Sequence, residues 1–353
     1  MISTRHITTG EQRGTAMVVR FWGVRGSLPA PARENMRYGG NTSCVEVRSD
    51  GQLLILDGGS GIRLLGEELL RSSDSKRIEG ALLFSHIHWD HIQGLPFFGP
   101  GYSAKNHFQI FSAPGSGWRL QRALENQMSL PHFPVDLREM RGLAGIEELG
   151  AESVTLGNLH IRTVQLNHPG GCAGFRIETS SASLGYLPDH EPYSERPNEM
   201  ESATVAHRTL VEFLRNLDVL ILDTQYTAAE YVQRVGWGHG CLSESVRLAI
   251  EASVDRLILF HHDPSHHDEQ IDEMVETART LAAGSGLIVD AAAENTALTV
   301  GLTGSRAPET YGTASFPIDL ALAPPPSAFE PVHGSDKSGI LSGETAQTAF
   351  GLL

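Results

Sequence analysis

Ser85-His86-Ile87-His88-Trp89-Asp90-His91 is the stretch that decides the fold, because it places four metal-type ligands within six residues. It follows the apolar run 81–84, which has the pattern of a buried strand. Alternation along an extended segment puts His86 and His88 on one side, and a helical turn starting near Trp89 would bring Asp90 and His91 back toward the same point. Imidazole and carboxylate together suit Zn, Mn or Fe. The stretch therefore predicts a two-metal site rather than a run of surface histidines.

The composition is that of an acidic globular protein. The chain has 353 residues, enough for one large domain or two ordinary ones, with 40% hydrophobic and 20% charged residues. Its formal net charge is -15, which argues against a broad basic surface for long nucleic acids. A small anionic substrate stays compatible with this charge, because bound divalent metals reverse the sign of the local field.

The ends of the chain differ from its middle. Residues 1–16 are polar without periodicity, and prolines recur among Ala, Ser and Gly beyond about residue 304. We predict a disordered leader over 1–16, a folded domain over 17–303 and a disordered tail over 304–353. The three cysteines are far apart and form no CxxC motif, and no run of 18 apolar residues occurs. These features predict a cytoplasmic protein without a membrane span.

Four further buried runs end at a histidine or an aspartate. The residues at or just after these ends are His168, Asp189, Asp223 and His261. Taken alone, each would be an ordinary polar loop residue, but all share the strand-end position of the first cluster. Strands and then helices occur in two successive sets along the chain, which predicts two stacked β-sheets flanked by helices.

Several other segments carry expectations. Two glycine-containing loops, 24–31 and 37–42, would lie beside the metals with Arg25 or Asn41 near substrate or ligands, although a pair of plain turns is the alternative. Asp57 closes another buried strand, and loop hydrogen bonding or support of a ligand suits it better than coordination. The amphipathic pattern over 209–216 predicts a helix.

The stretch 85–91 resembles the HxHxDH signature of the metallo-β-lactamase superfamily, and His168, Asp189 and His261 match its later metal motifs. The resemblance covers about residues 17–302. Within the superfamily, the sequence is most similar to ribonuclease Z and its phosphodiesterase relatives. The resemblance implies an α+β fold, the αββα sandwich of two mixed β-sheets flanked by helices.

The resemblance also implies a ligand set for two divalent ions, zinc first, with Mn or Fe as alternatives. One ion would be held by His86, His88 and His168, the other by Asp90, His91 and His261, and Asp189 would bridge them. A water or hydroxide shared by two cations has a depressed pKa and is a nucleophile at neutral pH. His239 would contact the phosphate or protonate the leaving oxygen, with Asp223 orienting it; a structural hydrogen bond is the alternative for this pair.

The sequence departs from ribonuclease Z in two places. It has no insertion rich in Gly, Pro and basic residues, and Gly240 stands where that family has a hydroxyl residue after the histidine. Together with the negative charge, this argues against precursor transfer RNA as substrate. The segment after the last ligand, with His262, His266 and His267, is richer in ligand types than the family motif. Capping and surface exposure explain these histidines more simply than a regulatory metal site.

Three functions are compatible with these residues. The favoured one is a two-metal phosphodiesterase acting on a small or cyclic nucleotide or a related diester, because Asp223 and His239 would supply a positioned acid for a phosphoryl leaving group. The second is a hydrolase of a lactone or thioester on the same metals. The third is a non-hydrolytic accessory protein with this fold, against which the intact ligand set argues. A homodimer is common in the resembling group.

Overall fold

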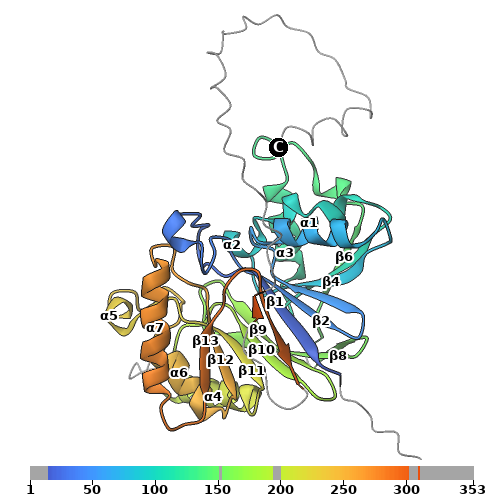
Figure 1. Cartoon of the computed structure of the whole chain (residues 1–353). Helices are drawn as coiled ribbons and strands as arrows, with labels where there is room; N and C mark the ends of the chain where they lie inside the picture. Colours follow the sequence, from blue (N-terminus) through green and yellow to red (C-terminus); the bar gives the residue numbers. More distant parts are fainter. Residues whose placement is uncertain (1–14, 151–152, 194–199, 302–308, 311–353) are drawn as a thin grey trace, which may run out of the picture. The chain divides into compact units, whose positions relative to one another are not determined.

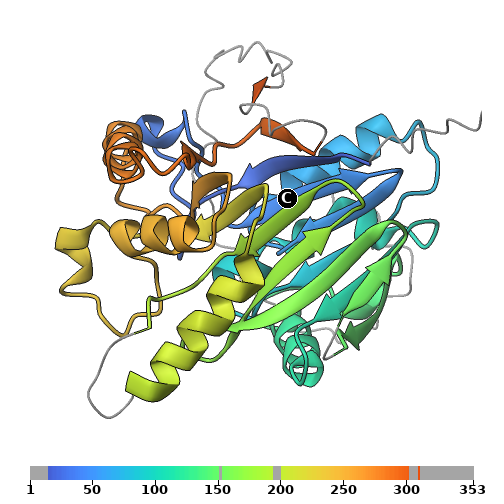
Figure 2. The ribbon, with the colours of Figure 1, turned by 90° about the horizontal axis from the view of Figure 1, so that it is seen from below.

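The described residues form two β-sheets that pack face to face between two layers of helices (Figures 1 and 2). The structure is a computed structural model, which describes residues 15–150, 153–193, 200–301 and 309–310. This architecture confirms the predicted αββα sandwich of two mixed sheets.

The first sheet contains eight strands in the order β15-β14-β1-β2-β3-β4-β5-β6. Its strands are β1 (Met17–Gly23), β2 (Cys44–Ser49), β3 (Gln52–Leu56), β4 (Glu79–Phe84), β5 (His107–Ser112), β6 (Leu143–Glu148), β14 (Thr296–Val300) and β15 (Glu309–Thr310). Strands β3 to β6 run parallel to one another, whereas β15, β14, β1, β2 and β3 pair antiparallel in turn.

The second sheet contains seven strands in the order β13-β12-β11-β10-β9-β8-β7. Its strands are β7 (Val154–Leu156), β8 (Leu159–Leu166), β9 (Cys172–Glu178), β10 (Ser183–Leu187), β11 (Val219–Asp223), β12 (Arg256–Phe260) and β13 (Ile288–Ala291). Strands β10 to β13 are parallel and β7 to β10 pair antiparallel, so each sheet has a parallel part and an antiparallel part.

The longer helices cover the outer faces of the sheets, and the short ones lie in connections between strands. The helices are α1 (Ile62–Ser72), α2 (Trp89–Ile92), α3 (Gly117–Gln127), α4 (Met200–Leu214), α5 (Ala228–Tyr231), α6 (Leu242–Glu251) and α7 (Asp268–Leu281), with 3-10 turns at Arg33–Asn35, Leu95–Phe97, Gly99–Tyr102 and Leu137–Glu139. Apolar residues of α1 and α3 pack on the first sheet, and those of α4, α6 and α7 pack on the second (Figure 1). No described helix has the length and apolar character that a membrane crossing requires.

Strand β11 shows why a central strand of the second sheet is a continuous apolar run up to its last residue. Val219 and Ile221 face the core between the sheets, whereas Leu220 and Leu222 face the helices. A strand buried on both faces reads as a continuous hydrophobic run, and only its last residue, here Asp223, is free to be polar. Parallel strands have their carboxyl ends at one edge of the sheet, so the polar residues that follow them come together there.

Some expectations differ from the structure or lie outside it. The helix expected over 209–216 runs from Met200 to Leu214, so the prediction missed its first nine residues. The predicted leader and tail fall almost wholly outside the described residues. Within the tail range, Glu309 and Thr310 pair with β14 as a short strand.

Candidate metal centre

The carboxyl ends of four strands bring the predicted ligands into two adjacent groups. We call His86, His88, His168 and Asp189 the open cluster, and Asp90, His91, Asp189 and His261 the buried cluster. Within each cluster, the potential ligand atoms lie within 4.8 Å of one another. The names reflect exposure: His88 is an exposed residue, whereas every member of the buried cluster is buried. The structure therefore brings together all seven predicted metal ligands, in the two sets that the family resemblance implies.

Asp189 belongs to both clusters and directs one carboxylate oxygen at each. Its Oδ2 lies 3.6 Å from Nε2 of His86 and 3.6 Å from Nε2 of His168, in the open cluster. Its Oδ1 lies 3.0 Å from Nε2 of His91 and 3.3 Å from Nε2 of His261, in the buried cluster. Two donors around one tetrahedral zinc ion are about 3.3 Å apart. The spacing around Asp189 therefore matches that of atoms sharing a small cation.

Hydrogen bonds hold four of the imidazoles with Nε2 toward the centre. Nδ1 of His86 lies 3.1 Å from Oγ of Ser85, and Nδ1 of His168 lies 2.8 Å from the carbonyl oxygen of Gly238. In the buried cluster, Nδ1 of His91 lies 2.8 Å from Asp57, and Nδ1 of His261 lies 3.0 Å from Oε1 of Gln225. When Nδ1 carries the proton in each ring, Nε2 keeps a lone pair for a metal.

Asp57 supports histidines of both clusters through hydrogen bonds. Its Oδ2 accepts hydrogen bonds from His91 at 2.8 Å, from Oγ of Ser85 at 2.8 Å and from the hydroxyl of Tyr186 at 2.8 Å, and its Oδ1 accepts one from the Ser85 amide at 2.7 Å. Because Ser85 donates its hydroxyl proton to Asp57, its oxygen is free to accept the Nδ1 proton of His86. Asp57 thus orients one histidine of each cluster, the supporting role that the sequence favoured over direct coordination.

Four atoms at the centre are buried and have no hydrogen-bond partner among the described residues. They are Nε2 of His86, Nε2 of His91 and both carboxylate oxygens of Asp189. Leaving such polar atoms unsatisfied costs free energy, and a cation between them would remove that cost. Together with the mixed imidazole and carboxylate donors, this indicates that the residues present fit two divalent ions.

The electrostatics of the two clusters differ. Burial lowers the pKa of His86, His88 and His168, which keeps these rings neutral and able to donate a lone pair. Burial would also lower the pKa of His91, but the carboxylates of Asp189, Asp90 and Asp57 outweigh it and hold that pKa well above its usual range. The buried cluster therefore concentrates negative charge that a cation can balance.

His239 and Asp223 form a hydrogen-bonded pair at the edge of the centre. Nδ1 of His239 lies 3.1 Å from Oδ2 of Asp223, and 3.7 Å from Oδ2 of Asp189. Burial lowers the pKa of His239, but the hydrogen bond and charge of Asp223 raise it to about 9 overall. Asp223 is itself fixed, because the amides of His190 and Gln225 donate to its carboxylate. The pair predicted from the sequence is thus present, with His239 partly exposed.

The first loops approach the centre through residues other than those expected. Arg25 is fully buried and donates to backbone carbonyls, including those of Gly39 at 2.7 Å and His266 at 2.6 Å. Asn41 is bound to Glu294 at 2.9 Å. Both side chains are therefore engaged with other groups, which corrects the expectation that Arg25 or Asn41 would contact substrate or ligands. Instead, the amide of Ser27 donates to Oδ2 of Asp90 at 2.7 Å.

The extra histidines after the last ligand join loops together. His262 is bonded to the carbonyl of Ala292 at 2.9 Å, His266 to Glu230 at 2.9 Å, and His267 to Asn35 at 3.1 Å. Asp268 accepts hydrogen bonds from the backbone amides of Arg37 and Tyr38. These separate partners indicate structural roles, although not the simple surface exposure expected for His262 and His266, which are buried.

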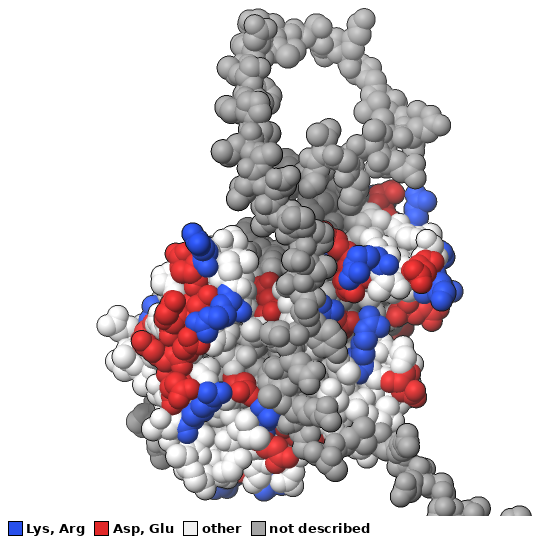
Figure 3. Space-filling model, viewed as in Figure 1, with Lys and Arg blue, Asp and Glu red and all other residues white. Residues whose placement is uncertain are grey.

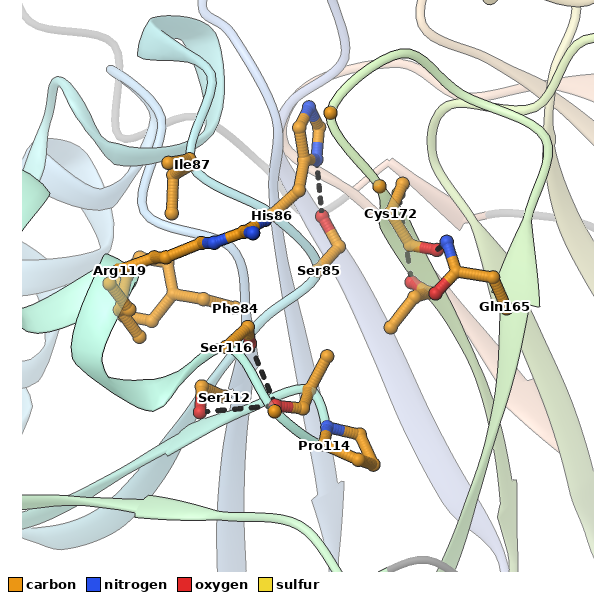
Figure 4. Close-up of a pocket in the computed structure, with 16 residues that line it drawn as sticks. Phe84, Ser85, His86, Ile87, Ser112, Pro114, Ser116, Arg119, Gln165 and Cys172 are labelled. Carbon is orange, nitrogen blue, oxygen red and sulfur yellow. Dashed lines mark hydrogen bonds between the residues drawn. The ribbon is translucent and has the colours of Figure 1, made fainter.

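A cavity of about 150 Å³ lies on the other side of the His86 backbone, between the ends of β4 and β5 and the turn from β8 to β9 (Figure 4). Figure 4 shows Arg119 extending from α3 toward His86, while the imidazole of His86 turns away from the cavity. The turn includes Gly170, where an added Cβ would lie 3.8 Å from Nε2 of His88. The cavity therefore adjoins the open cluster.

Comparison with known proteins agrees with this geometry. Residues 56–262 match the model of the beta-lactamase superfamily domain. The chain belongs to this superfamily. It is 25% identical to ribonuclease Z of Thermoplasma acidophilum over 295 residues, which cover 73% of this chain and 90% of that protein. This membership indicates a metal-dependent hydrolase, and the clusters fit the two divalent ions usual for the fold.

Two solved structures share the superfamily fold. The metallo-beta-lactamase fold protein YhfI from Bacillus subtilis aligns with a TM-score of 0.59 and 20% identity, covering 81% of this chain and all 100% of that one. A diphosphatase from the PhnP family aligns with a TM-score of 0.56 and 19% identity, covering 81% and 98%. Because the relative from Thermoplasma is named a ribonuclease, the expectation against long nucleic acids stays a prediction.

Two residues that support the ligands carry no recognisable signal in the sequence. Gln225 orients His261 across 36 positions of the chain, and the carbonyl of Gly238 orients His168 across 70. A backbone carbonyl has no sequence signature, and a glutamine after a strand is common in any loop. The glycine is the nearest to a signal, since Gly238 has a φ of +91° and an added Cβ would lie 2.5 Å from Nδ1 of His168.

Proposed function

We propose that this protein is a two-metal-dependent phosphodiesterase that hydrolyses a small or cyclic nucleotide, or a related phosphodiester. His86, His88 and His168 would hold one ion, and Asp90, His91 and His261 the other, with Asp189 contributing an oxygen to each. Zinc is the favoured metal because the donors are chiefly imidazole. When bound, two such ions supply Lewis-acid stabilisation of phosphoryl oxygens and lower the pKa of water.

The observation that carries the proposal is the position of His239. Its Nδ1 is 3.1 Å from Asp223 and 3.7 Å from Asp189, so the ring lies directly beside the residue shared by both clusters. Its Nε2 makes no hydrogen bond with a described residue, and the ring lines a cavity open to solvent. A histidine fixed through one nitrogen and free at the other is suited to donate a proton to a leaving oxygen.

The remaining residues would prepare the site for this step. Asp223 holds the proton on Nδ1 of His239 and stabilises the ring when it is charged, so that Nε2 faces the departing group. Asp57, through His91 and Ser85, keeps ligands of both clusters in fixed orientations. The exposure of His88 leaves the open cluster accessible to a substrate from solvent. An alkoxide leaving group of a phosphodiester is a poor one and gains most from such a proton donor.

The superfamily relatives support phosphorus-centred chemistry. One is named ribonuclease Z, and one structural neighbour is described as a diphosphatase. The charge of the surface supports a small substrate over a long nucleic acid. Helix α7 carries five acidic residues and one arginine, and Figure 3 shows acidic side chains gathered over it. A polyanion would be repelled from such a surface.

The test is a panel of phosphodiesters, lactones and thioesters with zinc-loaded protein. His239→Ala should lower kcat for a phosphodiester with an alkoxide leaving group by about 10²–10⁴-fold. The same variant should lower kcat less for a diester with a p-nitrophenolate leaving group, because that anion departs with little protonation. The matched control is His160→Ala, an exposed histidine on β8 whose Nδ1 contacts Thr155. Lactone or thioester turnover without diester turnover would overturn the proposal, as would equal loss on both kinds of diester.

A further inference from the structure

A cavity beside His239 could hold the leaving group of a phosphodiester. A cavity of about 330 Å³ opens beside His239, on the side of the loop from α5 to α6. Trp237, Arg234 and Tyr226 lie in its wall together with His239. A group that takes a proton from His239 inside this cavity would lie against these side chains. In that position they would select among leaving groups.

Trp237 is exposed, yet its backbone is held firmly. The residue has 61% of its surface accessible, so its ring is open to contact with a ligand. Glu191 accepts hydrogen bonds from the amides on either side of it, those of Gly236 at 2.5 Å and Gly238 at 2.9 Å. The carbonyl of Gly238 is bound in turn by His168. An exposed ring on a backbone anchored to the metal centre is a preorganised surface for another planar ring.

Arg234 provides a positive group in the same wall. Its guanidinium lies 4.9 Å from the centroid of the Tyr226 ring, and Nη1 donates to the carbonyl of Glu230 at 3.3 Å. It makes no ion pair with a described residue, although the protein is acidic and many of its arginines are paired with carboxylates. Its remaining N–H groups are available for an acceptor on a ligand.

We propose that this cavity is a leaving-group subsite for a nucleoside, whose base stacks on Trp237 while Arg234 donates hydrogen bonds to acceptors on the base. This inference rests on the proposed phosphodiesterase function and narrows it to diesters with a nucleoside as the departing alcohol. The indole accounts for a planar aromatic group, and the guanidinium accounts for one that carries acceptors. A simple alkyl group would use neither side chain.

The kinetic test compares two diesters with alkoxide leaving groups: a dinucleoside monophosphate and a dialkyl phosphate that carries no nucleoside. Trp237→Ala should lower the ratio of their kcat/KM values about 5- to 100-fold, because stacking of one base is lost. Trp237→Phe, which keeps a ring, should retain most of the ratio. The control is Trp118→Ala on α3, which is similarly exposed at 62% and lies outside the cavity wall. A ratio that Trp237→Ala and Trp118→Ala leave equally unchanged would overturn the subsite.

A binding test separates this inference from the proposed function. Adenosine 5′-monophosphate should bind the zinc-loaded wild type and quench its tryptophan fluorescence, and both effects should weaken in Trp237→Ala and Arg234→Gln. Ribose 5-phosphate should compete poorly. Trp237-dependent binding without hydrolysis of any diester would support the subsite and contradict the phosphodiesterase. Diester hydrolysis with equal binding of the nucleotide to wild type and Trp237→Ala, or with ribose 5-phosphate competing as well as the nucleotide, would contradict the subsite and leave the phosphodiesterase standing.

Discussion

The open and buried clusters share Asp189 but provide different surroundings for an ion. The open cluster has three imidazoles and one carboxylate, and its His88 is exposed. The buried cluster has two imidazoles and two carboxylates, all of them buried. More negative charge at lower solvent exposure should bind a divalent ion more tightly. From this comparison we expect the buried cluster to hold its ion more tightly, and the ion of the open cluster to be more accessible to exchange and to substrate.

The hydrogen bonds that fix the ligands are also more direct in the buried cluster than in the open cluster. In the buried cluster, His91 is bonded directly to the Asp57 carboxylate and Asp90 is held by the amide of Ser27. In the open cluster, His86 reaches Asp57 only through the hydroxyl of Ser85, and Nδ1 of His88 has His168 as its neighbour at 3.0 Å. Contacts that fix a ligand before the ion arrives reduce the cost of binding. The buried cluster is therefore the more preorganised of the two.

Removing the shared residue should have the largest effect. Asp189→Ala takes one carboxylate oxygen from each cluster, and we expect both ions to be weakened and diester hydrolysis to fall about 10³-fold or more. Metal analysis and kcat on one sample check this. A variant that loses only one ion would show that Asp189 serves a single cluster.

Replacing one ligand in each cluster should lower activity by unequal amounts. We expect His261→Asn to cost about 10³-fold in activity and His88→Asn about 10- to 100-fold, because only the first leaves buried carboxylates uncompensated. Asparagine is chosen because the backbone of His261 is left-handed, with a φ of +61°, a conformation that asparagine tolerates. The two variants are compared at saturating zinc by kcat/KM, and equal losses would remove the distinction between the clusters.

Asp57→Asn should weaken both clusters by a smaller amount. It replaces a carboxylate that supports His91 directly and His86 through Ser85, and we expect metal affinity to fall about 10- to 100-fold. Asparagine also suits the left-handed backbone of Asp57, whose φ is +59°. The control, Tyr186→Phe, removes one donor to Asp57 and leaves its histidine contact in place. Competition with a fluorescent zinc chelator measures both, and a larger effect from Tyr186→Phe would contradict the role given to Asp57.

Graded chelation should reveal the smallest difference. We expect the zinc of the open cluster to leave at a lower chelator concentration than that of the buried cluster, so that zinc release has two phases. In His88→Asn, the first phase should occur at a still lower concentration while the second stays in place. Zinc release in one phase from the wild type would mean that the two clusters bind with equal strength.

The strand ends are predictable from the sequence because burial dictates them. Apolar runs that end in His or Asp place His86, His168, Asp189 and His261 at one edge of the fold, and the strands end at Phe84, Leu166, Leu187 and Phe260, directly before these polar segments. The helical turn predicted at Trp89 is α2. The assignment of ligands to two sets depends on the family resemblance, since spacing alone does not say which distant histidine joins which pair.

The parts that escape prediction depend on contacts between distant segments. Strands β6 and β13 have mixed burial without a clear alternation, so hydrophobic periodicity does not reveal them. Arg25 resembles a substrate-facing residue but satisfies backbone carbonyls of two loops, one of them more than 230 positions away. The left-handed backbone of His261, which turns its ring toward Asp189, likewise follows from tertiary packing.

The most direct test of the two-cluster account is a zinc titration of chelator-treated protein that follows bound zinc and dinucleoside monophosphate hydrolysis in the same samples. The account predicts two zinc ions per chain, with hydrolysis appearing as the second ion binds and the first occupying the buried cluster. Full hydrolytic activity at one ion per chain, or binding of two ions with unchanged activity in Asp189→Ala, would contradict it.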